Sequence, residues 1–118
     1  AVARAGIPAG VVSNSGFGGR ALCYELEKHG LLKYFRFVMS TADYGVRKPH
    51  PMIFLTAAAK LGNKPENIWF FGDSHFHDIR GAAGVGMKAF WYNPKGEKDT
   101  DPAPHVELRH WDELAAAL

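Results

Sequence analysis

The chain has 118 residues, 47% of them hydrophobic, with one cysteine and a formal net charge of +2 at pH 7. That length allows one core but not two, so we expect a single domain over residues 1–118 and, with one cysteine, no disulfide within the chain. The scattered, nearly balanced charges exclude a nucleic-acid or membrane footprint, and without a visible signal peptide or membrane-spanning run the default location is the cytoplasm.

Strand and helix patterns alternate along the chain. An apolar strand is predicted at 10–13, followed by a helix at about 19–29, and a second strand covers about 35–40. The later expected elements are a helix at 51–62, a strand at 68–72, a short helix at 78–83, a strand at 88–92, a polar loop at 93–104, a short edge strand at 106–108 and a closing helix at 111–118. This alternation favours an α/β fold.

Two acidic residues follow the apolar run at 68–72. Asp73 comes directly after it in the segment Gly72-Asp73-Ser74, and Asp78 follows in the next turn. An unbroken apolar run is typical of a strand buried on both faces, and open parallel sheets bind ligands at the carboxyl ends of such strands. Two carboxylates there suit Mg²⁺, which prefers oxygen ligands. The alternative is that both aspartates cap the short helix that begins near Asp78.

Two upstream segments add groups that suit a phosphate. Residues 13–16, Ser-Asn-Ser-Gly, follow the first predicted strand, and glycine beside small polar side chains lets the backbone approach an anion closely. Lys48 precedes Pro49, a proline expected to open the next helix, so the lysine would enter the site from a rigid support. Taken singly, these segments could equally be a turn and a solvated lysine.

The order of the three segments is more specific than any one of them. With the surrounding patterns Lys-Pro-x-Pro-x-x-Phe and Asp-Ile-x-Gly-Ala, residues 7–93 resemble motifs II, III and IV of the haloacid dehalogenase-like (HAD) hydrolases. The resemblance implies a three-layer Rossmann-like core with a mostly parallel sheet. It also implies a Mg²⁺-dependent phosphatase that acts on a small phosphorylated metabolite through an aspartyl-phosphate intermediate.

The resemblance assigns a role to each matching residue. Ser13 would hydrogen-bond the transferring phosphoryl group, with the backbone amide of Asn14 beside it. Lys48 would neutralise charge on the nucleophile and the phosphate. Asp73 would bind Mg²⁺, and Asp78 would support the ion directly or through water. Phosphoryl transfer needs much positioning and charge stabilisation of this kind beyond its nucleophile.

The nucleophile motif of the family is absent. HAD enzymes attack through an Asp-x-Asp motif at the end of their first strand, whereas the earliest acidic residue here is Glu25, inside a predicted helix. We therefore expect a fragment that begins just before the Ser13 strand, lacks the central first strand and the cap, and is inactive alone. In the family that strand lies between those ending at Ser13 and Asp73, so the inner sheet edges would be exposed and would recruit a missing N-terminal half or self-associate.

The missing nucleophile also supports a noncatalytic alternative. A HAD-fold remnant or interaction module would keep the same scaffold without the activity. A haloacid dehalogenase is less favoured, because such relatives work without Mg²⁺ and generally lack this acid pair. A receiver domain is disfavoured as well, because its acids precede its Lys-Pro. The substrate stays open among sugar phosphates, phosphoglycolate and nucleotides, since selectivity resembles a property of the cap.

Two histidines raise the question of a softer metal. His75 and His77 precede Asp78, and histidines beside aspartates can bind zinc. Residues two apart in a loop need not converge, however, and the acid pair already suits a hard cation. Mg²⁺ is therefore the expected ion, and His105 and His110 show no partner pattern in the sequence.

Overall fold

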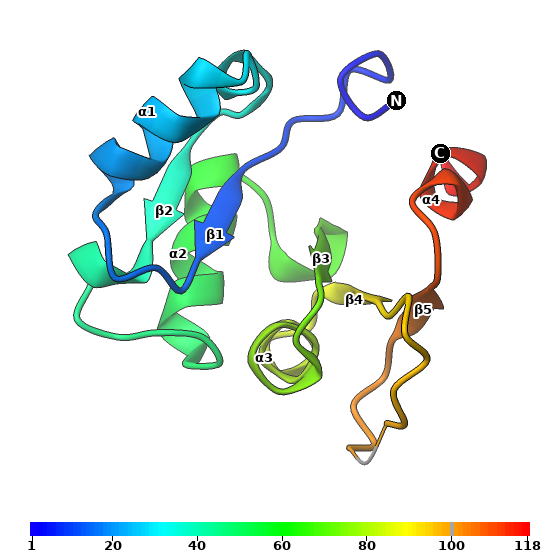
Figure 1. The fold of residues 1–118 in the computed structure, drawn as a ribbon. Helices are drawn as coiled ribbons and strands as arrows, with labels where there is room; N and C mark the ends of the chain where they lie inside the picture. The colour runs from blue at the N-terminus through cyan, green and yellow to red at the C-terminus, as the bar shows by residue number, and fades with distance from the viewer. Residues whose placement is uncertain (100) are drawn as a thin grey trace.

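The computed structural model describes residues 1–99 and 101–118, and within them it contains five strands and four α-helices, which alternate except where β5 follows β4 (Figure 1). They are β1 (Val11–Ser13), α1 (Gly19–Lys28), β2 (Val38–Ser40), α2 (Pro51–Leu61), β3 (Trp69–Gly72), α3 (Arg80–Gly84), β4 (Lys88–Tyr92), β5 (Val106–Leu108) and α4 (Asp112–Ala117). The predicted order of elements is confirmed. Within the predicted loop at 93–104, residue 100 lies outside the described residues.

All strand pairings are parallel, but they form two separate sheets. One sheet pairs β1 with β2, and the other has the order β3-β4-β5. In the described part of the chain β1 pairs only with β2 and β3 only with β4, and no strand lies between them in Figure 1. The α/β fold with parallel sheets is thus confirmed, and the sheet is interrupted where the expected central strand is missing.

Helix α2 joins the two sheets through its buried side. Ile53 belongs to the same core cluster as Met39 of β2, whereas Phe54 belongs to the cluster that contains Trp91 of β4. Consecutive positions on a helix point about 100° apart, so a wide apolar face can contact both sheets at once. A single helix therefore covers the interruption between the sheets and holds them in one fold.

Helix α2 begins at Pro51, as predicted for the helix at 51–62, so Pro49 does not open it. The Nδ1 atom of His50 accepts a hydrogen bond from Met52 N at 3.1 Å. His50, which is exposed, is therefore the N-cap of the helix. The helix ends at Gly62, whose φ of 69° is the left-handed conformation that glycine adopts without strain.

Strand β3 is less buried than its apolar sequence predicts. Trp69 is 39% exposed and the rest of the strand is half-buried, whereas Ala89, Phe90 and Trp91 of β4 are buried. The reason is position: β4 is the central strand of its sheet, while β3 is an edge strand beside the interruption. The expectation of a strand buried on both faces is therefore wrong for β3 as it stands here.

Helices α1 and α4 lie at the periphery and contain no buried residue. Helix α1 packs beside β2, and α4 closes the described chain near the last strand (Figure 1). Among the described residues, every helix is too short or too polar to cross a bilayer.

We expect Gly81→Ala to lower the free energy of unfolding by about 1–3 kcal/mol, because it overpacks the junction of α3 with α2. A Cβ atom at this position would overlap the ring of Phe54 and lie 3.2 Å from the Cα atom of Pro49. Urea denaturation measures the change. The matched control is Gly84→Ala in the same helix, where a Cβ atom meets nothing within 4 Å. Equal losses in both variants would contradict this close-packing argument.

Candidate functional site

The carboxyl ends of β1 and β3 border one cleft of about 440 Å³. Its lining includes all five residues that the sequence singled out, namely Ser13, Asn14, Lys48, Asp73 and Asp78. The first two come from the end of β1, the lysine from the segment before α2, and the aspartates from the turn after β3. Open parallel sheets bind ligands at this edge, so the arrangement is that of a ligand site.

A buried ion pair forms the floor of the cleft. The Nζ atom of Lys48 lies 2.6 Å from Oδ1 of Asp78, and the two side chains are only 10% and 5% exposed. Nζ also donates a hydrogen bond to the carbonyl oxygen of Val12 in β1 at 3.1 Å, and the backbone N–H of Ser74 donates to the second carboxylate oxygen of Asp78 at 3.1 Å. Both charges are thus paired and hydrogen-bonded, as burial requires.

The local sequence explains how Asp78 reaches this position. A π-helical turn (His75–Ile79) leads into α3, and Asp78 folds back from it over the end of β3. A Cβ atom on Gly72 would overlap the side chain of Asp78, so the glycine provides the space that the carboxylate occupies. The turn is capped by Ser74, whose Oγ atom accepts a hydrogen bond from His77 N at 3.2 Å. The alternative that the two aspartates serve as helix caps is therefore wrong.

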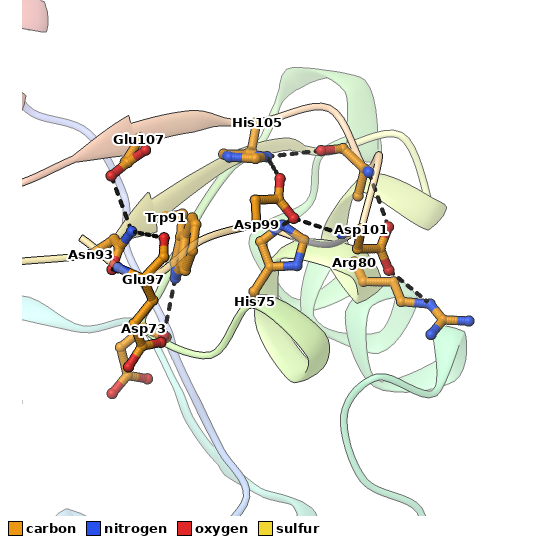
Figure 2. A network of polar contacts seen from close by, with 11 residues as sticks. Asp73, His75, Arg80, Trp91, Asn93, Glu97, Asp99, Asp101, His105 and Glu107 are labelled. Atoms are coloured by element: carbon orange, nitrogen blue, oxygen red, sulfur yellow. Dashed lines mark hydrogen bonds and ion pairs between the residues drawn. The ribbon is translucent and has the colours of Figure 1, made fainter. Parts of the chain in front are cut away.

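Asp73 stands apart from the ion pair. It is exposed at the cleft, and its backbone carbonyl accepts a hydrogen bond from Nε1 of Trp91 in β4 at 3.1 Å (Figure 2). The indole holds the main chain, which leaves the carboxylate itself to face solvent. Asp73 and Asp78 thus offer oxygen atoms of different kinds, one exposed and one already engaged with Lys48.

The side chain of Asn14 has a role that the sequence did not reveal. Its Nδ2 atom donates to the carbonyl oxygen of Lys48 at 3.1 Å, and its Oδ1 atom accepts from the backbone N–H of Lys48 at 2.9 Å. This pair of bonds fixes the lysine backbone against the end of β1. The two residues are 34 positions apart, so no local pattern could have indicated the contact.

Three further polar residues line the cleft, and the sequence did not assign any of them to this site. They are Arg47, Ser74 and His77. Nδ1 of His77 lies 2.9 Å from Oγ of Ser74, whereas His75 points away from the cleft toward Asp99. His75 and His77 therefore contact different residues, and within the described residues they do not form one metal site.

Comparison with known proteins gives a family and relatives. The family model described as haloacid dehalogenase-like hydrolase matches residues 1–92. Among curated proteins, the glyceraldehyde 3-phosphate phosphatase of Methanopyrus kandleri is 35% identical over 95 residues, which cover 76% of this chain and 41% of that protein. The family match, over residues 1–92, spans every residue of the cleft named above.

Two solved structures extend the comparison to the fold. A HAD phosphatase from Thermococcus onnurineus has a TM-score of 0.85 and 34% identity, over 98% of this chain and 52% of that one. A 2-haloacid dehalogenase from Pseudomonas syringae pv. Tomato has a TM-score of 0.81 and 29% identity, over 93% of this chain and 45% of that one. The chain thus spans about half the length of these relatives.

Replacing Asn14 tests its part in holding Lys48. We expect Asn14→Ala to lower the free energy of unfolding by about 2 kcal/mol, because two backbone groups of Lys48 lose their partners in a partly buried place. Chemical denaturation measures this. The control is Asn63→Ala at an exposed position, which should change stability by no more than about 0.5 kcal/mol. If the control lost as much free energy of unfolding as Asn14→Ala, the proposed role of the Asn14 side chain in holding Lys48 would be contradicted.

Proposed function

This chain belongs to the haloacid dehalogenase-like hydrolase family, and from that membership we propose that it forms part of a Mg²⁺-dependent phosphatase. The substrate would be a small phosphorylated metabolite, processed through an aspartyl-phosphate intermediate. One observation carries the proposal: a hydroxyl, a buried lysine and two aspartates line a single cleft at the ends of parallel strands. Such a combination supplies the charge stabilisation that phosphoryl transfer requires.

The nucleophilic aspartate is proposed to lie outside this chain, on a strand between β1 and β3. Val12 of β1 and Phe71 of β3 both line the cleft, and the described strands leave the space between β1 and β3 without a pairing partner. A strand placed there would bring its carboxyl end beside Ser13 and Lys48. The 118 residues by themselves should then be inactive, and a preparation of verified intact mass can be assayed to check this.

Lys48 is suited to act on a nucleophile in that place. An ammonium group has three N–H donors, and those of Lys48 contact the carbonyl oxygen of Val12 and the carboxylate of Asp78. A third donor is left for the nucleophile or for a phosphoryl oxygen. Asn14 and the ion pair hold the lysine in place before substrate arrives, so little reorganisation is needed during the reaction.

The two aspartates would contribute to a Mg²⁺ site in different ways. Asp73 is exposed at the cleft and would bind the ion directly, while Asp78, engaged by Lys48 and Ser74, would support it directly or through water. Mg²⁺ usually binds through one or two carboxylates and keeps several waters, which this donor set allows. When bound, the ion would neutralise charge on the transferring phosphoryl group.

The acid pair favours a phosphatase over a dehalogenase. A dehalogenase is among the structural neighbours, so the fold alone does not separate the two activities. The remaining alternative is an inactive remnant. An assay of the complete protein with phosphate esters and Mg²⁺ distinguishes the two, because the absence of turnover would favour the remnant.

Asp73→Asn should abolish Mg²⁺-dependent turnover of p-nitrophenyl phosphate by the complete protein, with a fall in kcat of at least about 100-fold. The amide keeps the size of the side chain but loses the charge that binds the cation. Because Asp73 is exposed, the thermal unfolding midpoint (Tm) of the variant should stay near that of the wild type. Asp112→Asn, an exposed aspartate of α4, is the control and should retain full activity. Undiminished turnover in Asp73→Asn would contradict the metal assignment.

Ser13→Ala should lower kcat by about 100-fold, because the hydroxyl that would donate to a phosphoryl oxygen is lost. The matched variant is Ser13→Thr, which keeps a hydroxyl at the same position and should retain more activity than the alanine variant. Steady-state kinetics with saturating Mg²⁺ measures both. If the two variants were equally active, the hydroxyl would have no part in the reaction.

A further inference from the structure

A second group of metal-ligating side chains lies outside the lining of the cleft. His75 comes from that turn, and Asp99 and His105 come from the segment between β4 and β5 (Figure 2). One ligand atom from each lies within 4.8 Å of the others. The Nε2 atom of His75 is 3.0 Å from Oδ1 of Asp99, and Nδ1 of His105 is 3.6 Å from Oδ2 of the same carboxylate.

The cluster contains a buried nitrogen atom that lacks a hydrogen-bond partner. Nε2 of His75 is shielded from solvent and has no hydrogen-bond partner in the described structure, since its contact with Asp99 is not aligned as a hydrogen bond. The side chains of His75 and His105 are 14% and 15% exposed. A buried polar atom without a partner is costly, and a cation between the imidazoles and the carboxylate would satisfy all three groups.

The surroundings hold the ligands in place. The backbone N–H of Asp101 donates to Oδ1 of Asp99 at 2.8 Å, and Asp101 in turn pairs with Arg80 of α3 at 3.7 Å. Nδ1 of His105 lies 2.8 Å from the carbonyl oxygen of Ala103. In the structure this nitrogen donates to the carbonyl, so an ion bound at Nδ1 would replace that hydrogen bond and the imidazole would carry its proton on Nε2.

We propose that His75, Asp99 and His105 bind a transition-metal ion of the Zn²⁺ type, separate from the Mg²⁺ site of the cleft. Two imidazoles and one carboxylate suit such an ion better than Mg²⁺, which prefers oxygen ligands throughout. Ligand atoms of tetrahedral Zn²⁺ lie roughly 3.3 Å apart, so small side-chain rotations close the set, and water takes the fourth position.

The ion would fasten the segment between β4 and β5 to the turn that carries Asp78. Trp91 connects this place to the cleft: its ring centroid lies 4.9 Å from that of His75 and 5.6 Å from that of His105, and its Nε1 atom bonds the backbone of Asp73. The role that follows is structural, because the ion would hold two segments of the chain together and would take no part in the chemistry of the cleft.

Zn²⁺ titration of the complete protein tests the proposal. Isothermal titration with ZnCl₂ is carried out in excess Mg²⁺, which occupies the carboxylates of the cleft. We expect one Zn²⁺ site in the wild type, weakened at least about tenfold by His105→Gln. The control is His110→Gln, because Nδ1 of His110 also lies near a carboxylate, 3.1 Å from Asp112, but in an exposed place. Absence of Zn²⁺ binding by the wild type, or equal affinity in both variants, would overturn the proposal.

Thermal unfolding gives a second readout that does not depend on one variant. Zn²⁺ bound to the folded state should raise the Tm of the wild type and of His110→Gln, but not that of Asp99→Asn. The amide of Asp99→Asn can still accept the hydrogen bond from Asp101 N, so this variant should fold even if His105→Gln does not. The same rise in Tm for Asp99→Asn as for the wild type would place the bound ion elsewhere and overturn the assignment.

Discussion

The buried ion pair between Lys48 and Asp78 is the interaction on which the rest of the structure depends. It joins the segment before α2 to the turn after β3, and through Val12 it reaches the backbone of β1. A buried pair is weak evidence of net stabilisation, because desolvation offsets much of the attraction. Loss of one partner would leave the other charge buried and unpaired, at a cost of about 3–5 kcal/mol. The pair therefore specifies the relative position of two sheets that have no strand pairing with each other.

The same contacts build the fold and the cleft. Asn14 holds the backbone of Lys48, Gly72 makes room for Asp78, and α2 packs against both sheets. A change at Lys48 thus alters folding and charge in the cleft together. Residues at the rim, such as Ser13 and Asp73, carry less of the structure, so their contribution to chemistry can be measured separately.

The sequence predicted what depends on local pattern. Apolar runs that end in small or acidic residues predicted the strands, and the residues at the ends of these runs predicted the five cleft residues. The order of the motifs indicated the family. Contacts between distant segments were not accessible: the Asn14 side chain on the Lys48 backbone, and His105 beside His75, depend on how the elements pack. The exposure of Trp69 was missed for a related reason, since an apolar run does not reveal whether a strand has neighbours on both sides.

The interruption between β1 and β3 also has a mechanical consequence. Within the described residues no ladder hydrogen bond crosses it, so the two sheets can shift relative to each other without breaking a strand pairing. Among the described residues, the polar contacts that span it all involve Lys48, which bonds the Asn14 side chain, the carbonyl oxygen of Val12 and the carboxylate of Asp78. A shift between the two sheets would therefore act on the contacts of Lys48 and would change the width of the cleft.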